Sequence, residues 1–144
     1  MHVVSTARCF ACSSKANAAV EFAMVAPLLM ALLLGTVLYG YVLLVHHGVQ
    51  QLAAEAARSA VAGLSDAERD ALARNFVRDN AAAYGILDPS QLQVSSEIGP
   101  PPSAVIRISL SYDMTRSAVY RLSSLIPLPS PIVRRSAAVQ RGGY

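Results

Sequence analysis

A long run of uncharged, mostly apolar residues dominates the first third of the chain. No charged side chain occurs from Phe22 to Val45, about 24 residues that would be roughly 36 Å long as a helix. The hydrocarbon core of a bilayer is about 30 Å thick, so the run is long enough to span it. It is also longer than the apolar region of a cleaved secretory signal, about 7–15 residues. The pattern therefore predicts a membrane anchor.

Helical periodicity continues past this run. Apolar or small residues recur at spacings of three and four, whereas the polar side chains between them face elsewhere. The recurring residues are Val45, Val49, Leu52, Ala56, Ala60 and Gly63. We predict that the helix continues as a stem, that its narrow stripe packs on a neighbour, and that Gly63 ends it.

The next segment has the signals of a second helix. Ser65 and Glu68 form the Ser-x-x-Glu pattern of a capping box, and Asp70 and Arg74 are spaced for a surface ion pair. Gly85 is the expected end of the helix. The predicted apolar face consists of Leu72, Phe76 and Ala83, with Ala73 and Val77 beside them.

Period-two patterning then replaces the helical pattern. Four apolar residues alternate with polar ones between 106 and 112, which predicts a half-buried strand. Weaker strands are expected at 92–98 and at Ile132 to Gln140, and the proline-rich segments Gly99–Pro102 and Leu125–Pro131 should be irregular. The predicted fold class is α+β, in which a long N-terminal transmembrane helix continues into a stem. A second helix then packs on a small, mostly antiparallel sheet.

Charge orients the anchor. Arg8 and Lys15 precede the apolar run, and no acidic residue comes before Glu21. The positive-inside rule therefore places the N-terminus in the cytoplasm. We expect three parts: a basic cytoplasmic leader (1–16), a transmembrane helix and stem (17–64) and a small extracytoplasmic α+β domain (65–144). The net charge is +3 without a dense Lys/Arg stripe, so nucleic acid is not an expected partner.

The sequence offers no catalytic or metal-binding constellation. No histidine follows His47, so the far domain lacks the base of a Ser-His or Cys-His pair. His46 and His47 are adjacent and would point about 100° apart on a helix, which makes a poor chelate. Cys9 and Cys12 form a C-x-x-C without a second half. We therefore predict a non-enzymatic protein without a metal or cofactor.

Glu21 is the residue that most needs an explanation. It is a carboxylate at the start of a long apolar helix, where an ionisable group is functional by default. Further along, Pro27 lacks a backbone donor and should loosen the early helix. Ala31 and Gly35 form a small-xxx-small pair, which allows close approach of another helix but is also ordinary in membrane helices.

The run from Ala18 through Glu21 and Phe22 to Leu29 resembles the N-terminus of TadE-like pseudopilins, minor pilins of the tight-adherence (Flp, type IVc) pilus. The similarity continues through Gly35 and the stem Ala53–Val61. It returns loosely at Val105–Tyr112 and Ser136–Arg141. The N-terminal motif, directly before the membrane helix, carries most of the resemblance.

The resemblance implies a processing step and a set of partners. A prepilin peptidase would cut between Ala16 and Asn17, which leaves Glu21 at mature position five, and the leader would carry away Cys9 and Cys12. The glutamate and Phe22 would then serve assembly with other pilins, pseudopilins and platform proteins in membrane lipid. The family usually has Gly before the cut, whereas this chain has Ala16. An unprocessed single-pass adaptor or accessory protein of a secretion or adhesion system is therefore the alternative.

Overall fold

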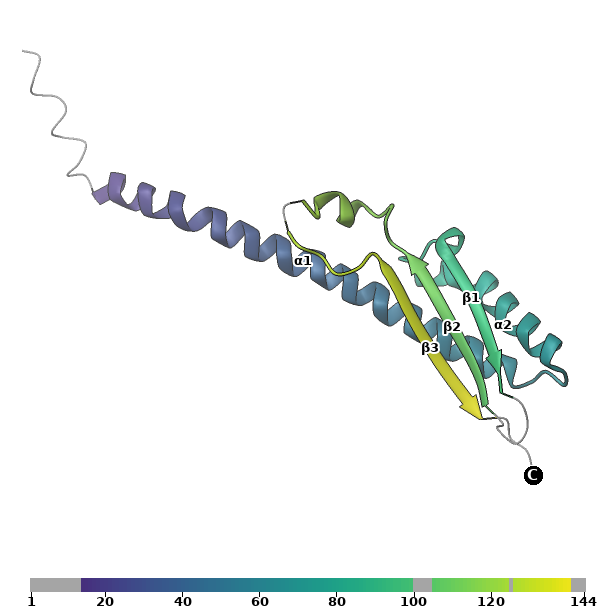
Figure 1. Ribbon diagram of the computed structural model, residues 1–144. Coiled ribbons are helices and arrows are strands. Elements are labelled where there is room, and N and C mark those ends of the chain that lie inside the picture. The colour runs from purple at the N-terminus through teal and green to yellow at the C-terminus, as the bar shows by residue number, and fades with distance from the viewer. Residues whose placement is uncertain (1–13, 100–104, 125, 141–144) are drawn as a thin grey trace, which may run out of the picture. The chain divides into compact units, whose positions relative to one another are not determined.

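The computed structural model describes residues 14–99, 105–124 and 126–140. They fall into two compact units, one ending at Leu38 and the other beginning at Tyr39. Helix α1 (Ser14–Ala60) contributes to both (Figure 1). We call the unit from Tyr39 onward the sheet unit and treat the two units separately.

The first unit consists of the N-terminal part of α1. The helix is unbroken from Ser14, and Pro27 lies inside it. Nearly all of its side chains from Asn17 to Val37 are exposed, although most are apolar. Asn17–Ala60 is a helix long and apolar enough to cross a membrane by length and composition. The predicted long apolar helix is therefore confirmed, and it is compatible with a membrane anchor.

A three-stranded antiparallel sheet forms the centre of the sheet unit (Figure 1). Its strands are β1 (Leu92–Ile98), β2 (Val105–Asp113) and β3 (Ile132–Gln140), in the order β1-β2-β3. The register pairs Leu92 with Tyr112 and Ile106 with Val139. All three predicted strands are present, and the α+β class is confirmed.

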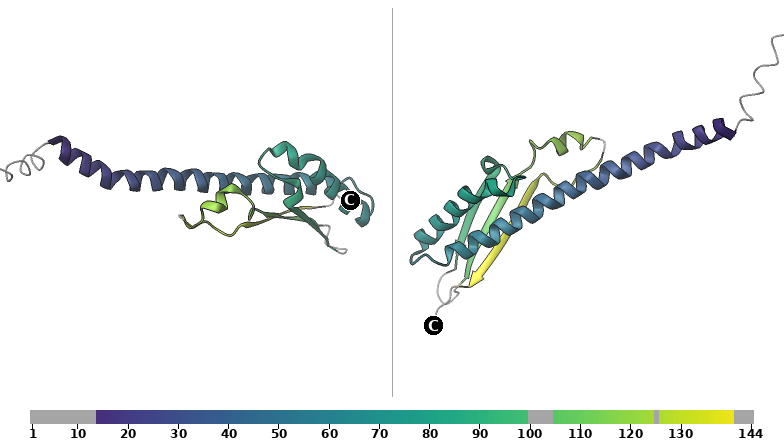
Figure 2. Two further views of the ribbon diagram at one scale, coloured as in Figure 1. Left: turned by 90° about the horizontal axis from the view of Figure 1, so that it is seen from above. Right: turned by 180° about the vertical axis from the view of Figure 1, so that it is seen from behind.

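Both helices cover the same face of this sheet (Figure 2). The stripe predicted on the stem is buried along its length from Val45 to Ala60, with Val45, Val49 and Leu52 at 0% exposure. It meets the inward residues of β2, among them Ile106 and Ile108, in one hydrophobic core. The neighbour predicted for the stem is therefore the chain's own sheet.

Helix α2 (Asp66–Asn80) begins as its capping signal predicts. Ser65 Oγ accepts a hydrogen bond from the Glu68 N–H at 3.2 Å. Glu68 Oε2 in turn accepts from the Leu64 N–H at 2.8 Å, one residue earlier than in the usual box. The predicted Asp70–Arg74 ion pair is also present, at 2.9 Å.

Several local predictions need correction. Helix α1 ends at Ala60, before Gly63, and α2 ends at Asn80 and passes into the 3-10 turn Ala81–Tyr84. Gly85 stops that turn with φ 63°, a conformation that glycine adopts without a steric penalty. Residues 126–131 have neither helix nor strand, as predicted, whereas Pro100–Pro102 and Leu125 lie outside the described residues.

The apolar face of α2 was also predicted with the wrong centre. Ala73 and Val77 are the residues of this helix that are buried. Leu72 and Phe76 are half-buried at its margin, and Ala83 is exposed. The buried face is therefore centred on Ala73 and Val77, each one position after the larger residue that the prediction placed there.

Candidate assembly segment and polar recesses

The segment predicted to be processed and assembled lies in the first turns of α1. Asn17, Glu21 and Phe22 are all exposed, Phe22 at 69%. Asn17 and Glu21 are four residues apart in one continuous helix, so they share a face. Ala16 lies in the same helix, whereas Cys9 and Cys12 are outside the described residues. A carboxylate and the residue that would carry a new amine are therefore held one turn apart.

The predicted helix-packing positions are open. Ala31 is exposed, and a Cβ added to Gly35 would meet nothing within 4 Å. Bulky side chains elsewhere on the helix, such as Leu32 and Leu33, are 65% and 61% exposed. Because Ala31 and Gly35 are small, they leave a low strip on their own face of the helix, which we call the Ala31–Gly35 notch. Another helix can approach closely at such a position.

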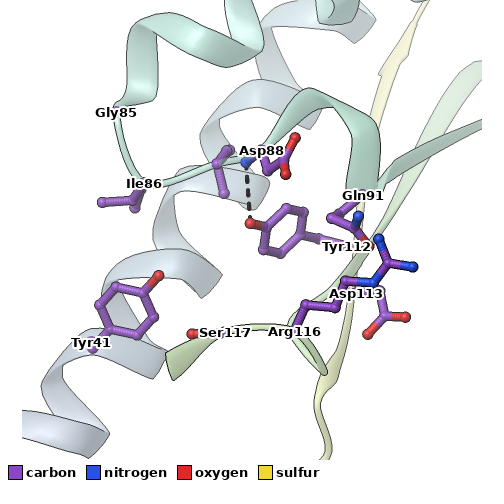
Figure 3. Close-up of a pocket in the computed structure, with 10 residues that line it drawn as sticks. Tyr41, Gly85, Ile86, Asp88, Gln91, Tyr112, Asp113, Arg116 and Ser117 are labelled. Atoms are coloured by element: carbon purple, nitrogen blue, oxygen red, sulfur yellow. Dashed lines mark hydrogen bonds between the residues drawn. The ribbon is translucent and has the colours of Figure 1, made fainter. Parts of the chain in front are cut away.

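A polar recess of about 300 Å³ lies in the sheet unit, between α1, the turn after α2 and the end of β2 (Figure 3). We call it the Tyr112 recess. The Asp88 N–H donates to Tyr112 Oη at 3.1 Å, which fixes the ring inside it. Tyr41 and Arg116 also line it.

Two carboxylates and one guanidinium set the charge of the Tyr112 recess. The hydroxyl and N–H of Ser90 lower the pKa of Asp88, and those of Thr115 lower the pKa of Asp113. Arg116 lowers both pKa values further through its charge. Arg116 offsets only one of the two carboxylates, so the lining of this recess keeps a net negative charge.

A second recess, of about 350 Å³, opens at the edge of the sheet along β3. We call it the Arg135 recess; His46, Ser130, Ile132, Val133, Arg134 and Arg135 line it. Arg135 Nη2 lies 2.6 Å from His46 Nδ1. A guanidinium only donates, so this nitrogen of His46 must accept and the ring is neutral.

Burial and the nearby charges of Arg135 and His47 lower the pKa of His46 from its ordinary value. Its other ring nitrogen, Nε2, is buried without a hydrogen-bond partner. The structure separates the two adjacent histidines, since His47 is exposed and His46 is held against β3.

Groups of histidine, cysteine and acidic side chains suited to a metal do not occur among the described residues. The two recesses lie in different parts of the sheet unit. His46, Arg134 and Arg135 line one of them, and Asp88 and Asp113 line the other.

The N-terminal helix matches a known family. Residues 17–58 match the family described as TadE-like protein. This segment is TadE-like. The predicted resemblance is thereby confirmed for residues 17–58, and it relates them to pilin-like proteins associated with the Tad pilus, which begin with an apolar helix. No curated protein and no solved structure matches the chain.

The TadE-like segment contains Glu21, Phe22, Pro27, Ala31 and Gly35, all of which the sequence singled out. Both recesses were missed, because they combine a few residues from α1 with residues far along the chain. One signal was available for the Arg135 recess: Arg135 interrupts the otherwise apolar alternation of Val133, Ala137 and Val139.

Proposed function

We propose that this chain is a minor pilin, or pseudopilin, that primes or supports assembly of a tight-adherence (Flp-type) pilus after cleavage by a prepilin peptidase. The observation that carries the proposal is the TadE-like match, which begins at Asn17, the residue after the predicted cut. The exposed apolar helix that follows supports it, because such a surface needs lipid or other helices around it.

Glu21 has a defined role in this proposal. Cleavage after Ala16 would give Asn17 a free amine, one helical turn from the Glu21 carboxylate. In an apolar bundle an unpaired charge is costly, whereas a carboxylate and an ammonium attract each other far more strongly than in water. Pairing of Glu21 with the amine of a neighbouring subunit would therefore set the register between helices.

The rest of the chain has a place in the same scheme. Residues 1–16 serve as the cytoplasmic leader, 17–64 as the transmembrane helix and stem, and 65–144 as the extracytoplasmic domain. The protein resides in the bacterial inner membrane as a single-pass protein, and a fraction of its molecules enters the pilus or its base. Its partners are the peptidase, other pilins and pseudopilins, and platform proteins. No enzymatic activity is part of this role.

The mature N-terminus tests the proposal directly. The protein recovered from membranes of its native host is analysed by N-terminal sequencing and intact mass. We expect a start at Asn17, and a start at Met1 when the prepilin peptidase gene is deleted. A start at Met1 in the unmodified host would refute processing.

Assembly is tested separately with Glu21→Gln, which removes the charge and keeps the size. We expect normal membrane insertion but at least about tenfold less pilin in co-purification, because a lost charge pair in an apolar setting is expensive. Glu97→Gln is the matched control, since Glu97 is an exposed carboxylate on β1. Equal recovery of pilins with both variants would contradict the role of Glu21.

The second candidate function is an unprocessed, membrane-anchored adaptor of a secretion or adhesion system. Ala16 favours it, because the family usually has Gly at that position. Ala16→Gly distinguishes the two: a peptidase substrate should be cut at least as fast when glycine replaces this alanine. An adaptor outside the pathway would keep its leader in both forms.

A further inference from the structure

Arg135 occupies an unusual position in the sheet. Along β3, the odd-numbered residues face the helices, and Val133 among them is only 1% exposed. Arg135 is on this inner side, and its guanidinium lies against His46 of α1. A guanidinium placed between a helix and a sheet normally has a carboxylate partner. Here the contacts that the structure gives are the neutral imidazole of His46 and the backbone carbonyl of Arg134, which accepts from Arg135 Nη1 at 3.5 Å.

Arg134 also lines the Arg135 recess, although its side chain belongs to the outer face of β3, where it lines a second hollow beside Ser111. Because β3 is an edge strand, alternate residues turn their backbone groups away from the sheet. The Ser136 carbonyl accepts from Gln50 Nε2 at 3.3 Å rather than from β2, so the even-numbered residues are the ones that face the edge. The Arg134 N–H therefore points out at the edge, whereas its side chain projects from the outer face of the sheet.

Ser130 completes the set of donors. Its Oγ accepts from the Ile132 N–H at 3.3 Å, which leaves its O–H able to donate. Its carbonyl accepts from Tyr120 Oη at 3.1 Å, which positions the segment. The lining of the Arg135 recess thus contains two arginines and a serine hydroxyl, and no carboxylate is among its lining residues.

We propose that the Arg135 recess binds a phosphate-bearing anion, held by Arg134, Arg135 and the Ser130 hydroxyl. Guanidinium groups bind phosphate oxygens through charge-assisted, paired hydrogen bonds, and a volume of about 350 Å³ accommodates a phosphate with an attached small headgroup. His46 keeps Arg135 in place and follows directly on Val45, the last residue of the uncharged run. Two sources can supply this phosphate: a lipid headgroup and free phosphate. The site is independent of the pilin role.

The test uses the full chain in a neutral detergent, with the amide signals of β3 followed by NMR. One arm titrates dihexanoyl phosphatidylglycerol below its micelle concentration, a second titrates inorganic phosphate, and a third adds sodium chloride to the same ionic strength. Saturable shifts at Arg134 and Arg135 with the lipid alone identify a headgroup site; saturation with inorganic phosphate identifies a free-phosphate site. Shifts that match those in sodium chloride would overturn the proposal.

Three variants make the test specific. Arg134→Gln and Arg135→Gln should each weaken binding about tenfold. Arg134 is exposed, so its variant stays informative if Arg135→Gln fails to fold. Arg107→Gln, an exposed arginine on β2 outside the recess, should bind as the unmodified chain does. Unchanged binding in Arg134→Gln, or an equal loss in Arg107→Gln, would refute a defined site.

Discussion

Tyr84 Oη donates a hydrogen bond of 3.0 Å to Glu55 Oε2 and so joins the turn after α2 to the stem part of α1. Both side chains are half-buried. Burial, followed by this hydrogen bond and the charge of Glu55, raises the pKa of Tyr84. The contact fixes the angle at which the chain returns from α2 toward the sheet, at a point where Gly48 and Ile86 also approach each other.

Tyr84→Phe removes only the donor. We expect the free energy of unfolding of the sheet unit to fall by about 1 kcal/mol, because the half-buried Glu55 loses one of its two donors and keeps Gln51 Nε2 at 3.2 Å. Hydrogen exchange of the β2 amides in detergent micelles measures this loss. In the Tyr84→Phe background, the further change Glu55→Gln should lower the free energy of unfolding only slightly. If it lowers this free energy as much as it does in the unmodified chain, the two residues do not act as a pair.

His46 should make the stability of the sheet unit depend on pH. Burial, Arg135 and His47 lower its pKa below the ordinary value of 6.5, so the unfolded chain takes up the proton at a higher pH than the folded chain does. The stabilisation is therefore complete above pH 6.5 and is lost progressively as the pH falls through the folded pKa. The melting temperature, followed by circular dichroism from about pH 7.5 to about pH 5, should decrease over this range.

The matched controls for this pH dependence are the two histidine variants. His46→Gln should remove most of the decrease, whereas His47→Gln should keep most of it, because His47 is the smallest of the three causes that lower the pKa of His46. Asp70, whose pKa is lowered by Arg74 and Ser96, changes stability only as the pH falls below about 3.8 and does not interfere. A decrease that survives in His46→Gln would assign it to another group.

Gly63 is constrained by close approach. A Cβ at this position would lie 2.7 Å from Arg69 Cγ and 2.9 Å from the Arg69 backbone nitrogen. Gly63→Ala should therefore destabilise the sheet unit by about 1–3 kcal/mol, as overpacking does. Gly40→Ala is the control, because nothing lies within 4 Å of its Cβ position and alanine favours a helix. Hydrogen exchange of α2 compares the two, and equal stability would contradict the steric argument.

Sequence periodicity predicted the elements of this fold but not all of their partners. The stripe from Val45 to Ala60 indicates which side of α1 is apolar, and that side is buried. Periodicity does not say what covers it, so the neighbour could have been another chain. The register of Ile106 with Val139 depends on long-range pairing that no local pattern specifies.

The two recesses show a similar limit. His46 and Arg135 are far apart in the sequence, and their contact depends on the phase of β3 against α1. What the sequence does contain is the exception to alternation at Arg135. A charged residue at an inward position of a strand is a usable signal, because its burial must be compensated by a partner. Glu21 was found by the same reasoning, in its case on a helix.

Gly35 should control helix association without affecting the fold. A Cβ there meets nothing in the chain within 4 Å, so Gly35→Leu should leave the hydrogen exchange of the sheet unit unchanged. A leucine would fill the notch beside Ala31 and keep a neighbouring helix from close contact, and we expect several-fold less pilin in co-purification. Leu33→Ile is the control, since position 33 lies about 200° around the helix from position 35. If both variants recover pilins equally, the Ala31–Gly35 notch is not the contact surface, and lipid rather than a helix covers it.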